Sequence, residues 1–510
     1  MPNRLPIIYV RGFAGDTAGV DRAVDDPFYG FNLGSTHVRV GGDGDPIFYQ
    51  FESPLLRLMT DRGYQLLVHG GQEFYLDAQE DGTVDAASVW IHRFYDTSAS
   101  TFGRTAVEFS VENAAADLLR LVEKVLAKTG APRVQLVAHS MGGLICRSMI
   151  QRHIPNTYGA NKEGPGGRRL AADFVDRLFT YGTPHGGIEF DVGFGLLESL
   201  RDTFGVNGAD IFGPKRMYEY LTPSSQLQSD APEGWDARVM PNDENFPLER
   251  VFCVVGTNAR DYAAAHGLSS KTVGPKSDGL VQIENALVTG ANHAYVHRSH
   301  SGRYGLVNSE EGYQNLIRFL VGDVKVTADL VDLRLPDLEE VTWQAETQVS
   351  IRGLPILMHE QTAEHYCPIL IEKRRPEDSA DRPVPLVTTY MWTQMLRPTE
   401  DSAMRYTLHV RVLSLREVKN GFLWQSHQEQ TSDFDDILIV DVETRDTGLV
   451  AWAVWNSQLS EPLRSYTPRG DPLTDQNDQD NAWLARVPLP VGGGFLGNAA
   501  AVTLTVRQAQ

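Results

Sequence analysis

The sequence predicts an α/β domain with a mostly parallel sheet, followed by a second domain that is all-β and sandwich-like. Two patterns support this division. In the first three fifths of the chain, short and nearly continuous apolar runs alternate with helical segments. In the remainder, apolar and polar residues alternate one by one, with polar turns between the runs. Strands buried on both faces produce the first pattern, and half-buried antiparallel strands produce the second.

The strands of the first domain are expected where apolar runs end at a glycine or a polar turn, at residues 6–10, 89–94, 134–139, 178–181 and 251–255. A helix is expected between the second and third of them. Ser110 suits its N-cap, Leu118 and Val125 lie on one apolar face, and Gly130 suits its C-cap. Strands that alternate with such helices favour a parallel sheet.

The second domain begins where the pattern changes. Met404, Leu408 and Val412 belong to a run in which every second residue is apolar, and residues 502–506 repeat this pattern. We therefore expect an α/β domain at residues 1–322 and a β-rich accessory domain at residues 328–510. The sequence gives no role for the accessory domain.

Two long stretches of the first domain, residues 16–50 and 188–247, have the irregular character of inserts. Inserts of this length in a compact domain are usually functional covers or disordered segments. Their aromatic and leucine content favours ordered covers, so residues 188–247 are expected to form a cap or lid. The aromatic residues 28–31 either line a pocket or pack locally.

Composition excludes several classes of function. The 510 residues carry a net charge of −20, which disfavours nucleic acid and anionic membrane surfaces as partners. No apolar stretch approaches the roughly 18 residues of a membrane span. No basic-then-apolar leader precedes the first strand, so a cytoplasmic protein is expected, with leaderless export as the alternative. Cys146, Cys253 and Cys367 are too few and too scattered for a disulfide framework or a zinc cluster. The oligomeric state is not indicated.

One short stretch carries the chemistry. Residues 136–145 read LVAHSMGGLI, in which a strand-forming run ends at Ser140 and small residues, Ala138 and Gly142, lie two positions on either side. A serine at the tip of a sharp strand-to-helix turn needs small neighbours because other backbone approaches it closely. The segment A-H-S-M-G resembles the G-x-S-x-G nucleophile elbow of α/β-hydrolases, in the form found in several bacterial lipases.

The resemblance covers about residues 5–320 and implies an α/β-hydrolase fold. The early segment IIYVRGFAG resembles the oxyanion turn of the family, and FTYGTPHGG resembles a strand-end motif of lipases and esterases. The family pattern implies that the backbone N–H groups of Phe13 and Met141 form the oxyanion hole. Many lipases have His-Gly where this chain has Arg11-Gly12. Because the donor is a backbone group, this change should not remove the hole, and Arg11 has either a role there or a structural ion pair.

In this family the acid follows a later strand and the base comes last. Asp278, in the motif SDGLV, resembles the acid turn of many lipases, and His300, in the motif HSG before a predicted last helix, resembles the histidine loop. The alternatives are Asp261 and Glu284 for the acid, and His297 and His293 for the base. His139 and His185 are expected outside the triad, since His139 should point away from the serine and His185 follows the wrong strand.

These motifs predict a serine carboxylic-ester hydrolase that acts on hydrophobic or lipid-like esters through Ser140, His300 and Asp278, without a metal or organic cofactor. The same triad would also serve a phospholipase, including one exported as an effector, an amidase or an acyltransferase. A scaffold that only binds is the third class, and it is disfavoured because no triad residue is missing. The acidic loop at residues 471–481 lacks the glycine and terminal glutamate of an EF-hand and is expected to be solvated.

Overall fold

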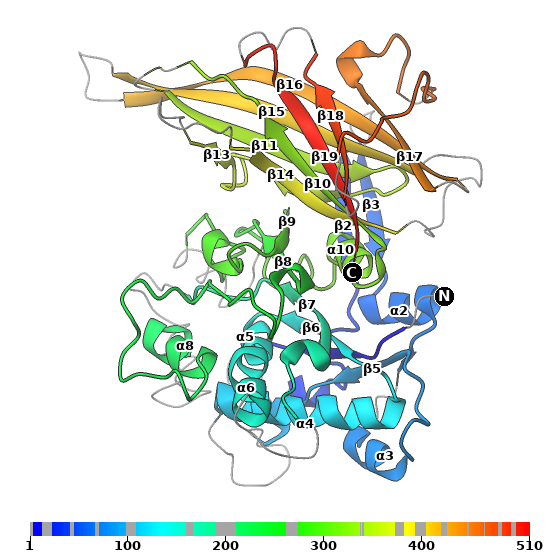
Figure 1. Ribbon diagram of the computed structural model, residues 1–510, viewed down its shortest axis with the longest axis vertical. Helices are drawn as coiled ribbons and strands as arrows, with labels where there is room; N and C mark the ends of the chain where they lie inside the picture. The colour runs from blue at the N-terminus through cyan, green and yellow to red at the C-terminus, as the bar shows by residue number, and fades with distance from the viewer. Residues whose placement is uncertain are drawn as a thin grey trace. The chain divides into compact units, whose positions relative to one another are not determined.

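The computed structural model describes residues 4–12, 23–40, 45–66, 71–97, 109–159, 167–188, 211–261, 274–336, 338, 341–372, 382–392, 404–419, 426–445, 448–463, 465–477, 482–490 and 496–509. The chain divides into two compact units, one of Met1–His293 with His297–Leu316 and one of Ala294–Val296 with Ile317–Gln510. Figure 1 shows the helices and central sheet of the first unit and the long strands of the second. The predicted domain limits and the role of each domain stay predictions.

A seven-stranded sheet has the strand order β4-β5-β1-β6-β7-β8-β9 and lies in the first unit, except for Ala294–Val296 of β9, which belong to the second. The bounds are β1 Ile7–Val10, β4 Gln65–Leu66, β5 Ser88–Ile91, β6 Val134–His139, β7 Val175–Tyr181, β8 Val251–Gly256 and β9 Asn292–Val296. β1 pairs in parallel with β5 on one side and β6 on the other, and the parallel pairing continues through β7 to β8. Every residue of β1, β5 and β8 is buried, which explains their continuous apolar sequences. The predicted mostly parallel sheet is confirmed.

The helices that lie wholly in the described residues of the first part of the chain include α2 Pro54–Arg62, α3 Gln72–Ala78, α4 Val111–Thr129, α5 Met141–Ser148, α6 Ile154–Tyr158, α8 Pro214–Leu221 and α10 Glu310–Val321. Shorter helical turns are η1 Phe94–Thr97, η3 Met149–His153, η4 Ala171–Asp173, η6 Leu248–Arg250 and η8 Ile283–Ala286. α4 confirms the predicted helix, since Ser110 Oγ accepts a hydrogen bond from the Asn113 N–H at 3.1 Å and Gly130 takes the left-handed conformation that ends it. α5 packs against α4 and against β1, β6 and β7.

Two details differ from the sequence-based expectations. The strand expected at residues 89–94 ends at Ile91, and a 3-10 turn begins at Phe94. The insert at residues 16–50 is not irregular throughout, because β2 Ser35–Val40 and β3 Pro46–Phe51 form an antiparallel hairpin. In the same insert Phe31 is buried and its ring stacks on Tyr9, with 4.4 Å between the centroids, so it packs locally.

The second unit contains two antiparallel sheets, which confirms the predicted all-β region (Figure 1). One has the order β14-β10-β19-β18, with β10 Val324–Val331, β14 Val384–Met391, β18 Trp483–Pro488 and β19 Ala501–Gln508. The other has the order β12-β11-β15-β16-β17, with β11 Val341–Ile351, β12 Leu357–Gln361, β15 Met404–Lys419, β16 Ser426–Arg445 and β17 Gly448–Trp455, while β13 Ile369–Ile371 pairs with β11 and η9 Asn456–Gln458 follows β17. The Trp455 indole N–H donates to the Pro488 carbonyl at 2.8 Å and so joins the two sheets.

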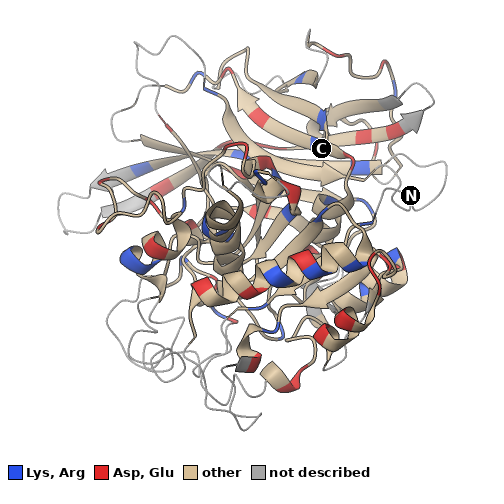
Figure 2. Cartoon of the chain, turned by 60° about the horizontal axis from the view of Figure 1, so that its bottom comes forward, with Lys and Arg blue, Asp and Glu red and all other residues tan. Residues whose placement is uncertain are grey.

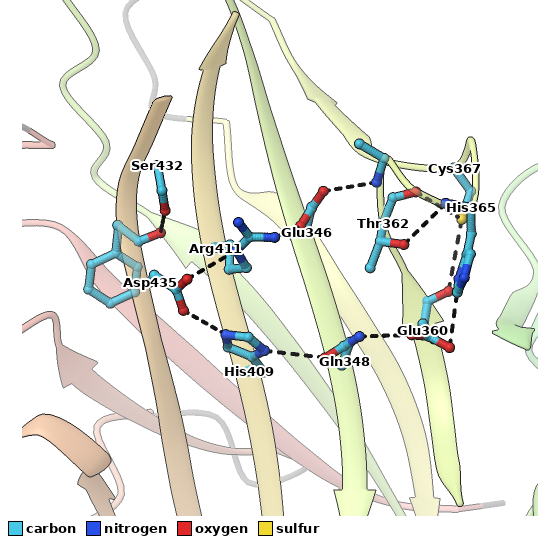
Figure 3. A network of polar contacts seen from close by, with 12 residues as sticks. Glu346, Gln348, Glu360, Thr362, His365, Cys367, His409, Arg411, Ser432 and Asp435 are labelled. Carbon is cyan, nitrogen blue, oxygen red and sulfur yellow. Dashed lines mark hydrogen bonds and ion pairs between the residues drawn. The ribbon is translucent and has the colours of Figure 1, made fainter. Parts of the chain in front are cut away.

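The larger sheet of the second unit has one apolar face and one polar face. Val410 and Val412 of β15 are completely buried, whereas the residues between and before them carry a polar network (Figure 3). Gln348 and His409 lie directly opposite each other on β11 and β15, and His409 Nε2 lies 2.7 Å from a carboxylate oxygen of Asp435 on β16. This alternation confirms the half-buried strand that the sequence predicts at residues 404–412.

Acidic and basic residues are interspersed over the described chain (Figure 2). Lys124 on α4 illustrates the pattern, because its Nζ lies 3.1 Å from a carboxylate oxygen of Glu73 and 2.8 Å from one of Asp77. Such exposed pairs each contribute only about 0.2–1 kcal/mol to stability. No helix in the described ranges combines the length and the apolar character needed to cross a membrane. The cytoplasmic location and its alternative, leaderless export, stay predictions.

Candidate active site

Ser140 stands at a sharp turn between β6 and α5. Its backbone has φ 54° and ψ −132°, a conformation that residues other than glycine rarely adopt. The turn is held from both sides, since the Ser140 N–H donates to the Tyr181 carbonyl at 2.9 Å and Thr183 Oγ1 donates to the Ser140 carbonyl at 2.8 Å. A strained backbone that neighbouring hydrogen bonds hold in place is typical of functional residues.

The residues around Ser140 must be small because other parts of the chain approach them closely. A Cβ on Gly12 would lie 2.4 Å from the Cβ of Ser140, and a Cβ on Gly142 would lie 2.1 Å from the Val10 carbonyl oxygen. A Cβ on Gly143 would lie 2.2 Å from Thr183 Oγ1. The end of β1 therefore presses directly on the serine turn. This contact explains why glycines accompany the serine in the sequence.

The structure brings Ser140, His300 and Asp278 together in one hydrogen-bonded chain. His300 Nε2 lies 2.9 Å from Ser140 Oγ, and His300 Nδ1 lies 2.8 Å from Asp278 Oδ2. The three residues are 160 and 22 positions apart along the chain, and all three are at most 4% exposed. A second contact fixes the same pair, because the His300 backbone N–H donates to the Asp278 carbonyl at 2.8 Å.

The SDGLV turn explains how Asp278 is oriented. Its Oδ1 accepts the backbone N–H groups of Leu280 at 3.0 Å and Val281 at 2.8 Å, which leaves Oδ2 for His300. A carboxylate only accepts hydrogen bonds, so the neutral imidazole carries its proton on Nδ1 and offers a bare Nε2 to the serine hydroxyl. Gly182 makes room for this pair, since a Cβ there would lie 2.9 Å from Asp278 Oδ2 and 3.1 Å from His300 Nδ1.

The alternative acids and bases lie elsewhere. Asp261 Oδ2 accepts from the Asn258 side chain at 2.6 Å, and Glu284 is exposed. His297 is exposed and its Nδ1 lies 3.3 Å from Thr257 Oγ1, while His293 Nδ1 lies 3.1 Å from the Ala291 carbonyl oxygen. None of these contacts involves Ser140, so the geometry favours Asp278 and His300 over their alternatives.

Of the two remaining histidines of the motifs, His185 is buried and His139 is half-buried, and they lie in different surroundings. His185 is completely buried, with Nε2 3.2 Å from Thr180 Oγ1 and 3.6 Å from Cys253 Sγ. Burial, reinforced by the charge of Arg147, holds the pKa of His185 well below its usual range. His139 lies against His300, with its Nε2 2.9 Å from the His300 carbonyl oxygen. Sequence reasoning excluded His139 from the triad and missed this contact.

One of the two implied oxyanion donors lies in the described residues. Met141 is the first residue of α5, so its backbone N–H is among those that no carbonyl of the helix accepts. The helix terminus also favours negative charge at this point. Phe13 lies outside the described residues. The Gly12 carbonyl just before it accepts a hydrogen bond from the buried Tyr95 hydroxyl at 3.2 Å, which fixes the end of that turn.

The described part of the predicted cap, residues 188 and 211–247, packs against α5 and the residues that follow it. α8 buries Met217 and Tyr220, and the Tyr220 hydroxyl donates to the Ile211 carbonyl at 2.9 Å. The buried Arg147 guanidinium donates to the Val239 carbonyl at 3.4 Å, and burial lowers the pKa of Arg147 to about 10. Residues 189–210, the leucine-rich part of the predicted cap, lie outside the described residues, and its role as a lid stays a prediction.

Within the described ranges, no group of three or more His, Cys, Asp and Glu side chains is arranged to hold a metal ion. In the acidic loop at residues 471–481, the Asp475 carboxylate accepts the backbone N–H groups of Asn477 and Leu484, both at 2.9 Å. Residues 478–481 lie outside the described part of the chain. The Asp475 carboxylate therefore stabilises this turn and its connection to β18.

The strand order, the serine turn after β6 and the histidine loop after the last strands define an α/β-hydrolase fold. Residues 67–167, which include Ser140, match the family model of lipase (class 2). The predicted resemblance to lipases and esterases is thereby confirmed. The fold and this match support hydrolase activity of the lipase or esterase type.

Two solved structures show a weaker likeness. One is a gene product of Listeria innocua, with 13% sequence identity, a TM-score of 0.25, and coverage of 62% of this chain and 94% of that one. The other is lipase B of Aspergillus fumigatus, with 12% identity, a TM-score of 0.27, and coverage of 58% of this chain and 45% of that one. Because these scores are low, the fold assignment rests on the strand order and the serine turn.

Proposed function

We propose that this protein is a serine carboxylic-ester hydrolase in which Ser140 is the nucleophile, His300 the general base and Asp278 the group that orients His300. The observation that carries the proposal is the continuous contact from Ser140 Oγ through the imidazole to the carboxylate, at 2.9 and 2.8 Å. These distances lie within the reach that proton transfer requires. A serine is a weak nucleophile unless an adjacent base removes its proton as it attacks.

The reaction proceeds by two acyl transfers. Ser140 Oγ attacks the ester carbonyl carbon while its proton moves to His300 Nε2, and a tetrahedral intermediate forms. The C–O bond to the alcohol breaks, and His300 Nε2 returns the proton to the leaving oxygen. Water then attacks the acyl-enzyme with the same assistance, which releases the acid and restores Ser140. Asp278 stabilises the imidazolium that exists between the proton transfers.

The negative oxygen of each tetrahedral intermediate needs hydrogen-bond donors that are already in place. The Met141 N–H at the start of α5 is the donor that the described residues offer, and Phe13 is the proposed second donor. Removal of one such donor typically slows the chemical step about 10²- to 10³-fold. A backbone donor costs no side-chain ordering, and the strained serine turn already fixes its direction.

Hydrophobic esters are the proposed substrates. The sequence of the cap, rich in leucine and aromatic residues, motivates this choice, because apolar substrates bind in shielded apolar pockets. The triad itself is equally suited to phospholipids, amides or transfer to an alcohol. A panel of p-nitrophenyl esters of increasing chain length, phospholipids and competing alcohols therefore decides the substrate class.

The central test compares wild type with Ser140→Ala on p-nitrophenyl esters. We expect the variant to lose at least about 10⁴-fold in kcat and to lose labelling by a fluorophosphonate probe. Ser148→Ala is the matched control, since Ser148 is buried at the end of α5 and its Oγ makes no hydrogen bond within the described residues. Turnover by Ser140→Ala at the wild-type rate would remove Ser140 from the mechanism.

A further inference from the structure

His139 is next to the proposed nucleophile in the chain and contacts the proposed base, although it is not part of the triad. It is the last residue of β6, directly before Ser140, and its Nε2 lies 2.9 Å from the backbone carbonyl oxygen of His300. The rings of His139 and His300 are tilted by 39° with their centroids 4.9 Å apart. One side chain therefore contacts both the main chain and the ring of the proposed base.

The contact places a hydrogen on Nε2 of His139. A carbonyl oxygen only accepts hydrogen bonds, so the nitrogen that faces it, Nε2, must carry a hydrogen. Burial, together with the nearby His300 and Arg11, holds the pKa of His139 well below its usual range. His139 is therefore the neutral imidazole with its hydrogen on Nε2. A neutral ring at this distance leaves His300 able to become positively charged during catalysis, whereas a charged ring would oppose it.

We propose that His139 is a positioning residue that fixes the backbone of His300, and this inference rests on the proposed function of Ser140 and His300. With it, His300 is held at three points. Asp278 Oδ2 contacts its ring at 2.8 Å, the Asp278 carbonyl accepts its backbone N–H at 2.8 Å, and His139 donates to its carbonyl. The first two contacts fix the base relative to the acid. The third fixes the base relative to the strand that carries the nucleophile.

The loop that carries His300 explains why this third contact matters. The Ser299 N–H donates to the Tyr304 carbonyl at 3.1 Å, and the Leu306 N–H donates to the Ser299 carbonyl at 3.0 Å. These two hydrogen bonds lie within the loop and do not connect it to β6. His139 connects the same loop to β6, one residue from Ser140. A contact at this point helps to set the distance between Ser140 and His300. This matters because a displacement of about 1 Å in a catalytic group can slow a reaction about 10²-fold.

The test uses three substitutions of His139 in the full-length protein. Gln places an amide N–H at the reach of Nε2, Leu fills a similar volume without a donor, and Asn carries a donor that is one carbon too short. We expect His139→Leu to lower kcat about 10²-fold with KM changed less than about twofold, and His139→Gln to restore most of kcat. His139→Asn should resemble His139→Leu. Thermal unfolding of each variant shows whether the loss follows the donor or the stability.

Two results would overturn the inference: wild-type kcat in His139→Leu, or equal losses in the Leu and Gln variants when both are folded. If His139→Leu does not fold, equal kcat in the Gln and Asn variants would overturn it. Ser140→Ala is measured in parallel, so that an absence of Ser140-dependent turnover in wild type counts against the proposed function. In that case ¹⁵N-histidine NMR near neutral pH decides: a neutral His139 protonated on Nε2 supports the contact, and a charged or Nδ1-protonated ring overturns it.

Discussion

Acidification should destabilise the α/β unit through His92, a buried histidine outside the triad. His92 directly follows β5 and is 4% exposed. Its backbone N–H donates to the Tyr9 carbonyl at 2.9 Å, and its ring Nε2 lies 3.0 Å from the Ala114 carbonyl oxygen of α4. Burial lowers the pKa of His92 from 6.5 to about 4, although the contact with the Ala114 carbonyl opposes this. The folded protein therefore holds His92 neutral at pH values where the unfolded chain binds a proton.

The sign and size of the effect follow from this difference. Between pH 6.5 and about 4 the unfolded state binds more protons, so the free energy of unfolding falls as the pH is lowered through this window. At pH 5.5 the loss from His92 alone is about 1.4 kcal/mol, and below pH 4 it approaches about 3.4 kcal/mol. The contribution is fully present above pH 6.5. His139 and His185, whose pKa values are also lowered by burial, act in the same direction.

The assay is urea denaturation of wild type and His92→Gln at pH 8 and pH 5.5. Gln keeps an N–H that can reach the Ala114 carbonyl but does not titrate, so the variant should lose about 1.4 kcal/mol less than wild type between the two pH values. Taking the difference between pH values removes any constant cost of the substitution. His297→Gln, at an exposed histidine, is the control and should behave as wild type. The same pH dependence in wild type and His92→Gln would refute the argument.

Three further predictions concern the site and its support. Asp278→Asn should lower kcat about 10⁴-fold with little change in KM, measured on p-nitrophenyl esters, because the amide no longer holds His300 in the required tautomer. Gly182→Ala should lower kcat/KM about 10²-fold in the same assay, since the new Cβ would lie 2.9 Å from Asp278 Oδ2 and φ is +52°; unchanged activity would contradict the packing. Glu311→Gln should lower the free energy of unfolding by about 3–5 kcal/mol in urea denaturation. The reason is that the guanidinium of Arg298, whose Nε lies 3.0 Å from Glu311 Oε2, would stay buried but lose the negative charge of this carboxylate.

Local signals in the sequence predicted some elements correctly and others not. Ser110 and Gly130 fixed the limits of α4 because caps are local interactions. The β2–β3 hairpin was missed although its signal was present, in the form of two β-rich runs on either side of a glycine-rich turn. The strand predicted at residues 89–94 was too long, because β5 ends at Ile91, where the polar residues His92 and Arg93 interrupt the apolar run before η1.

The sequence by itself determined which reactive residues the chain contains and their order: a serine between small residues, followed by candidate acids and then by candidate histidines. It could rank His300 above His297 and His293 only by resemblance, because three histidines within eight residues have the same intrinsic chemistry. The tertiary structure favours His300, since its ring contacts Ser140, and this contact depends on how a loop 160 residues away returns to the end of β6. It also shows the place of His139, whose ring contacts the carbonyl of His300, 161 residues later in the chain. Residue types and their order can be read from the sequence. Contacts of a few ångströms between side chains that are far apart in the chain form only when the sheet has assembled.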